Sequence, residues 1–255
     1  MSTDAFIEEL WGYAKEVPMK EHPWFRGIVE HRWTREQIVQ GEVQHYLRVR
    51  TNPIYFSYIL ANATADGDYD LLEPIMDNIR EEFAGAKSHV DIMYQFLEEA
   101  GISKEEADLA EPTPGTLAAI ETIVGCCQRR SALEGIAMLA FVEAQHGGPG
   151  GAADSAYKEL IGHYGFSKYA AATYEIHAVE DVGHGSRQIE ALARYATNDE
   201  MRQKIRRAVQ LGVTAFSLEW DGHVQAMTGK REFWEGVAPL NLRQPKFKLP
   251  APQKA

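Results

Sequence analysis

The sequence has little cysteine, no long apolar run and fewer basic than acidic residues. Its two cysteines, Cys126 and Cys127, are neighbours in the chain, and adjacent residues do not easily form an unstrained disulfide. The N-terminal stretch opens with acidic residues and lacks the apolar segment of a signal peptide, and no window is long enough to span a bilayer. We therefore expect a protein of the reducing cytoplasm without a membrane partner.

The charge balance excludes a second class of partner. Lys and Arg number 26 against 37 Asp and Glu, a net charge of −11, which disfavours binding to nucleic acid or anionic lipid. Apolar residues make up 45% of the chain and charged residues 25%, as in a globular protein with a real core. We expect one helical domain over residues 1–240 and a basic, proline-containing tail over 241–255 that does not pack as helix.

The apolar pattern predicts helices throughout. Proline or glycine marks most breaks, for example Asn52-Pro53. Thr34 followed by Gln37, and Ser103 followed by Glu106, have the spacing of helix capping boxes. No segment shows the two-residue alternation of a strand, so we predict an all-α fold. Apolar residues recur every three or four positions at 4–16, 34–64, 68–83, 86–101, 115–146, 152–164, 167–197 and 199–228.

One predicted helix carries three ligand-type side chains. His177 and Asp181 are four residues apart, and Asp181 and His184 three apart, so all three project from a single face. Two imidazoles and one carboxylate suit iron, manganese or zinc and leave open positions on the metal. A helix surface that happens to carry these residues, or a core histidine paired with the aspartate, would give the same pattern.

Two further pieces supply the remaining ligand types. Glu82 and His89 are seven residues apart, close to two turns, so we expect them on one helical face. Glu143 ends an apolar helical run, where a buried acid needs a partner and a metal is one such partner. A solvated face for the first pair, and an exposed helix end for Glu143, are the alternatives. Together the pieces give three carboxylates and three histidines, the set with which a helical bundle holds two metal ions.

These residues resemble the heme-oxygenase-like diiron oxidases, a branch of the group that also contains thiaminase II and pyrroloquinoline-quinone synthase. The family pattern of a Glu and His seven apart, a lone Glu, and His-x3-Asp-x2-His falls on Glu82, His89, Glu143, His177, Asp181 and His184. His22-Pro23-Trp24, Tyr164-Gly165-Phe166 and a helical layout of roughly 220 residues extend the resemblance.

The resemblance implies a fold, a cofactor and partners. We expect a single-domain seven-helix bundle without heme that binds two ferrous ions through those six residues. With dioxygen as co-substrate it would oxidise a small organic molecule, amino-acid-like or carboxylate-bearing, in a biosynthetic pathway. The other expected partners are a second copy of the chain in a homodimer and an external electron donor.

The sequence departs from the family members that form para-aminobenzoate. Val142 replaces their tyrosine before the lone glutamate, and Phe25 or Arg26 replaces the tyrosine after the early His-Pro aromatic, which disfavours that product.

Other functions remain open as alternatives. A thiaminase-II-like hydrolase would need a cysteine near Val142, where none occurs. A metal-free oxidase of the quinone-synthase kind, or a non-catalytic helical binding protein, would not explain six ligand-type residues in register.

A few residues could contact the substrate or support the metal. Tyr46, Arg48 and Arg50 lie near the end of an early helix, where an arginine could bind a substrate carboxylate or simply lie on the surface. His146, three residues after Glu143, could be an extra ligand or cap the end of its helix.

Overall fold

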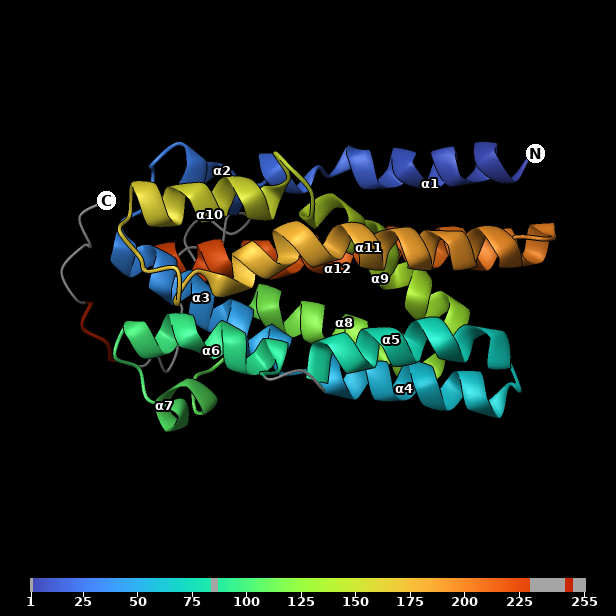
Figure 1. Cartoon of the computed structure of the whole chain (residues 1–255), viewed down its shortest axis with the longest axis horizontal. Coiled ribbons are helices and arrows are strands. Elements are labelled where there is room, and N and C mark those ends of the chain that lie inside the picture. The colour runs from blue at the N-terminus through green and yellow to red at the C-terminus, as the bar shows by residue number, and fades with distance from the viewer. Residues whose placement is uncertain (1, 84–86, 230–245, 250–255) are drawn as a thin grey trace.

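The described part of the chain is built from helices alone. The computed structural model describes residues 2–83, 87–229 and 246–249, without the side chains of residues 81 and 179–185. Within these ranges no strand occurs, and long helices run side by side in one bundle (Figure 1). The all-α prediction is confirmed, although the described residues form more helices than the seven expected. None of these helices has both the length and the apolar composition that a bilayer span requires.

Most of the described residues lie in α-helices. In chain order these are α1 (Thr3–Glu16), α2 (Pro23–Val29), α3 (Arg35–Val49), α4 (Asn52–Ala65), α5 (Leu72–Phe83), α6 (His89–Glu99), α7 (Lys104–Asp108), α8 (Pro114–Arg129), α9 (Ala132–His146), α10 (Ala152–Gly162), α11 (Ala172–Tyr195) and α12 (Asp199–Thr228). Short 3-10 turns, Met19–Glu21 and Tyr69–Leu71, precede α2 and α5. Two of the predicted segments each divide into two helices, and the short helices α2 and α7 lie outside every predicted segment.

Proline and serine explain the two divisions. The predicted segment 34–64 breaks between α3 and α4 at the Asn52-Pro53 break marked in the sequence, because Pro53 in the first turn of α4 has no amide hydrogen to continue a helix. The segment 115–146 breaks before Ser131, which forms a capping box with Glu134 at the start of α9. The capping boxes predicted at Thr34 and Ser103 are confirmed.

The expectation that Glu82 and His89 share one helical face is wrong. Glu82 lies one residue before the end of α5, and His89 is the first residue of α6. Ser88 and Asp91 form a capping box that begins the new helix, so a continuous two-turn spacing does not apply. The two side chains nevertheless meet, as described below, because α5 and α6 follow each other along the same side of the bundle (Figure 1).

Helix α12 lies in the middle of the bundle, against α3, α8 and α9. A methyl group added at Gly212 would lie 1.9 Å from the Met138 carbonyl oxygen of α9. One added at Gly222 would lie 2.5 Å from the Thr116 backbone nitrogen of α8. Only glycine permits such close backbone contact, so α12 is fixed against both neighbours.

This packing makes Gly212 sensitive to substitution. We expect Gly212→Ala to lower the free energy of unfolding by about 1–3 kcal/mol, because the backbone of α9 blocks the new methyl group. Urea denaturation of the two proteins measures the difference. The control is Gly12→Ala in α1, where nothing lies within 4 Å of the added methyl group. The free energy of unfolding of Gly12→Ala should rise by roughly 0.5–1 kcal/mol. A similar rise for Gly212→Ala would contradict the close approach of Gly212 to the backbone of α9.

A short piece of the basic tail contacts the bundle. Residues 246–249 are not helical, and the Lys248 amide donates a hydrogen bond to the Ala100 carbonyl at 3.1 Å. Phe247 and Leu249 pack against the core. The predicted domain boundary at residue 240 lies outside the described residues.

Candidate active site

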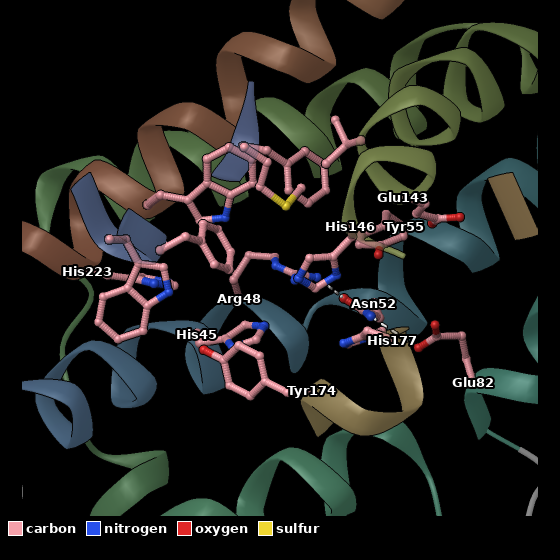
Figure 2. Close-up of a pocket in the computed structure, with 16 residues that line it drawn as sticks. His45, Arg48, Asn52, Tyr55, Glu82, Glu143, His146, Tyr174, His177 and His223 are labelled. Atoms are coloured by element: carbon pink, nitrogen blue, oxygen red, sulfur yellow. Dashed lines mark hydrogen bonds between the residues drawn. The ribbon is translucent and has the colours of Figure 1, made fainter. Parts of the chain in front are cut away.

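A cavity of about 590 Å³ lies between α2, α3, α4, α9, α11 and α12, with one residue of α5 at its edge. The apolar part of its wall is largely aromatic, and the polar part carries histidines and charged groups (Figure 2). The apolar and aromatic lining residues are Met19, Trp24, Phe25, Tyr55, Val142, Tyr174, Phe216 and Trp220, and the polar ones are His45, Arg48, Asn52, Glu82, Glu143, His146, His177 and His223.

Glu82 and His89, two of the predicted metal ligands, form a buried pair. The His89 Nδ1 atom lies 3.0 Å from Glu82 Oε1, and the Asn52 side-chain amide donates to Glu82 Oε2 at 3.2 Å. Burial alone would raise the pKa of Glu82, but the contacts with His89 and Asn52 outweigh it and hold the pKa below its usual range. Glu82 is therefore ionised, which is the form that binds a metal ion.

His177 reaches the same place from α11. Its ring centroid lies 5.4 Å from that of His89, with the two rings perpendicular, and 5.0 Å from that of His146. The Nδ1 atom of His177 is buried and has no hydrogen-bond partner among the described residues. Burial, followed by the nearby His146 and His89, lowers the pKa of His177 well below its usual value. The ring is neutral, as a metal-binding imidazole must be.

Glu143 lines the same cavity near the end of α9. Its Oε2 atom accepts a hydrogen bond of 2.6 Å from the Gln188 side-chain amide. His146, one turn further on, also lines the cavity. Its ring lies beside His177, so it is placed to support a metal ligand.

The two remaining predicted ligands are only partly visible. Asp181 and His184 belong to α11, so a single helix carries both of them together with His177, as predicted. Their side chains lie outside the described residues. Among the side chains that the structure does describe, no three His, Cys, Asp or Glu residues group as a metal site. The contacts that the structure shows are pairwise: His89 lies against Glu82 and His177 lies against His89, and Glu143 lines the same cavity as Glu82 and His177.

A second buried charge cluster was not expected from the sequence. The Arg48 Nε atom lies 3.0 Å from both carboxylate oxygens of Glu219, and Arg48 Nη1 donates to Asn52 Oδ1 at 2.9 Å. Burial alone would raise the pKa of Glu219. The charge of Arg48 and then the contact with His223 outweigh that effect and lower the pKa to about 2. Because Asn52 also donates to Glu82, it joins this cluster to the Glu82–His89 pair.

Glu42 organises a third group of polar side chains. It accepts a hydrogen bond from the Tyr174 hydroxyl, and its Oε2 atom lies 3.1 Å from His45 Nδ1. Burial, with the charge of Glu42, raises the pKa of Tyr174 well above its usual value, so the hydroxyl stays protonated. The pairs Glu42-x2-His45 and Glu219-x3-His223 have helical spacing, which is the one local signal that would have indicated these residues.

The depressed pKa of Glu219 predicts a loss of stability in acid. A carboxylate whose pKa falls on folding stabilises the protein above the unfolded pKa, here about 4.5, and that stability is lost as pH falls toward 2. We expect the metal-free chain to lose on the order of 3 kcal/mol from this group over that range. Urea denaturation between pH 6 and pH 3 should show a shallower decline in Glu219→Gln; parallel curves would contradict the assignment.

Neither cysteine is placed as a nucleophile, and one of the early-helix candidates lines the cavity. Cys126 and Cys127 are buried, and neither lines the cavity. Burial raises the pKa of both thiols, which does not suit a nucleophile. Of the three early-helix candidates, Tyr46 and Arg50 contact Asp108 outside the cavity, and only Arg48 lines it.

Comparison with known proteins places the chain in a family. Residues 43–217 match the model of a family described as iron-containing redox enzymes, which is more than half of the chain. The chain belongs to this family and is an iron-dependent oxidoreductase. The buried carboxylate and neutral imidazole at the cavity are the donor types that iron binds.

Relatives and solved structures agree with this placement. The 4-aminobenzoate synthase of Chlamydia muridarum is 28% identical over 198 residues, covering 76% of this chain and 80% of the relative. That of Nitrosomonas europaea is 21% identical over 232 residues, covering 87% of this chain and 92% of the relative.

A domain from Shewanella denitrificans with a heme oxygenase-like fold superposes with a TM-score of 0.70 at 14% identity, covering 90% of this chain and 97% of that one. A TenA homologue from Pseudomonas syringae also gives 0.70, at 15% identity, covering 88% and 96%. The fold is heme-oxygenase-like.

Proposed function

We propose that the chain is a diiron oxidase that uses dioxygen to oxidise a small organic substrate in a biosynthetic pathway. The observation that carries this proposal is the buried Nδ1 atom of His177, which has no hydrogen-bond partner among the described residues. The His177 ring lies against that of His89, which contacts Glu82, and both His177 and Glu82 line the cavity. The proposed ligands of the two ferrous ions are Glu82, His89, Glu143, His177, Asp181 and His184.

The donor set fits the metal. Ferrous ions would supply the electrons and the oxygen-binding positions, and the protein would supply geometry and a dry pocket. Asn52 holds one oxygen of Glu82 by a hydrogen bond and so fixes the plane of that carboxylate. Gln188 does the same for Glu143. Aromatic side chains, among them Phe25, Phe216 and Trp220, cover the other walls and limit the access of bulk water.

The formation of 4-aminobenzoate is the second candidate, since the curated relatives carry that name. Val142 lines the cavity at the position where family members with that activity have a tyrosine, which is why another product is the primary proposal. Incubation of the iron-loaded protein with oxygen and a reductant, followed by mass spectrometry for 4-aminobenzoate, separates the two. Catalytic accumulation of that product would replace the primary proposal.

The test of the diiron proposal is metal loading without oxygen. We expect close to two ferrous ions per chain, and oxygen uptake on exposure to air that an organic acid or amino-acid substrate accelerates. Binding of about one ion or none would overturn the diiron assignment. Full activity with a strong chelator present would favour the metal-free alternative. Light scattering tests the expected homodimer. The dependence of turnover on added reductant tests the expected electron donor.

A further inference from the structure

The cavity has a polar end that the proposed metal ligands do not use. Figure 2 shows His45 and His223 on one side of the cavity lining and Glu82 and Glu143 on the other, with Arg48 between them. Arg48 and His223 are almost fully buried, with 8% and 1% of their surfaces exposed. Buried polar groups that face a cavity need partners there.

Arg48 has hydrogen-bonding capacity left over. Its Nε atom is engaged by Glu219, and its Nη1 atom by Asn52. The Nη2 atom makes no hydrogen bond with any described residue, and the side chain lines the cavity. A guanidinium carries five N–H donors in a planar fork that matches a carboxylate. The remaining donors are therefore available to a ligand.

His223 makes no hydrogen bond with the described residues. Neither ring nitrogen makes a hydrogen bond with a described residue, and Nε2 lies 3.6 Å from Glu219 Oε1, beyond hydrogen-bond distance. Trp24 packs edge-on against the ring, with 4.9 Å between centroids. A buried imidazole whose nitrogens make no hydrogen bond is costly unless a bound molecule supplies one.

We propose that Arg48 and His223 bind the carboxylate of the substrate, whose apolar part lies along the aromatic wall toward Glu82 and His177. The proposal rests on the function proposed above and specifies its substrate class as an aryl or alkyl carboxylate. Trp24, Phe216 and Trp220 supply that wall, and the Arg48 guanidinium carbon lies 5.4 Å from the centre of the Phe216 ring.

The charges favour a carboxylate over an amine. An ammonium group would need acceptors at this end of the cavity. The two nearby carboxylates, Glu42 and Glu219, do not line the cavity and are already engaged by Tyr174 and Arg48. The wall itself presents donors, which an anionic oxygen pair can satisfy.

Matched acid and amide probes test the inference. The pairs are 4-hydroxyphenylacetate with 4-hydroxyphenylacetamide, and octanoate with octanamide. Binding is followed by quenching of tryptophan fluorescence, because Trp24 and Trp220 lie in the cavity wall. We expect at least one acid to bind about tenfold or more tightly than its amide, in both the anaerobic iron-loaded and the metal-free protein. Retention of the preference without metal excludes coordination to iron as its source.

Variants locate the preference. The double variant Arg48→Met/Glu219→Gln removes the guanidinium without leaving a charge buried, and should lose the acid preference. Arg50→Met, outside the cavity, is the control and should keep it. His223→Leu tests the same site with no change of net charge, and should weaken binding of the acid about fivefold or more. If the double variant does not fold, His223→Leu alone tests whether the carboxylate binds at this site.

Several results would overturn the inference. Equal affinities for acid and amide in the natural protein, or an acid preference that survives in both the double variant and His223→Leu, would do so. Iron content is measured in the same samples. Normal iron loading without any acid preference would remove the carboxylate site and leave the diiron proposal intact, whereas failure of the natural protein to bind iron would remove the diiron proposal first.

Discussion

Replacing His177 by alanine is expected to remove about one of the two ferrous ions and to lower substrate-dependent oxygen uptake by more than about 100-fold. Loss of a group that merely orients a ligand typically costs 10- to 100-fold, and loss of a ligand should cost more. The physical reason is local: the buried His177 Nδ1 belongs to a ring that lies against His89, and alanine leaves no metal-binding nitrogen there. Iron is measured by a colorimetric chelation assay after anaerobic loading.

A surface histidine provides the matched control for this substitution. His163 is exposed and stacks on His31 with 3.6 Å between ring centroids, away from the cavity lining. His163→Ala should keep full iron content, and circular dichroism should show that all variants retain their helices. Unchanged iron stoichiometry in both His177→Ala and Glu82→Ala would show that the metal site lies elsewhere.

Replacing Arg48 by methionine is expected to destabilise the metal-free protein by about 3–5 kcal/mol. The substitution leaves Glu219 buried and without its cationic partner, and breaking a buried ion pair from one side has a cost of this size. Urea denaturation at pH 7 measures it. Adding Glu219→Gln should recover much of the loss, because the neutral amide no longer requires a counter-charge.

Arg26→Met is the comparison for the buried pair. Arg26 pairs with Glu30 at 2.7 Å on the exposed face of α2, and such solvent-screened surface pairs contribute little to stability. If the two arginine substitutions have similar effects, the Arg48–Glu219 pair is not the buried contact that the structure shows.

The fold class was predictable because helices depend on local features of the sequence, namely the apolar period and the capping residues. The three- to four-residue apolar period located most helices, and the caps at Thr34 and Ser103 were read correctly. The break before Ser131 was missed because the apolar period runs through it, although Ser131 and Glu134 have capping-box spacing. Short elements such as α2 carry too few residues for a period to show.

The site was predictable only where its residues are close in sequence or of unusual type. The meeting of Glu82 with His89 was expected, but for the wrong reason, because two helices rather than one carry them. The Arg48–Glu219 pair joins residues 171 positions apart, and no local spacing rule reports such a contact. The sequence therefore could not tell whether Arg48 lies at a substrate site or on the surface, and the packing shows that it is buried in the cavity wall.

The glycine contacts of α12 bear on the thermodynamics of ligand binding. This helix supplies Phe216, Trp220 and His223 to the cavity. Its backbone packs closely against α8 at Gly222 and against α9 at Gly212. A wall that is already rigid loses little conformational entropy when a ligand enters, so such a cavity is preorganised. Differences in affinity among ligands should then reflect shape and hydrogen bonding, rather than the free energy needed to order the protein.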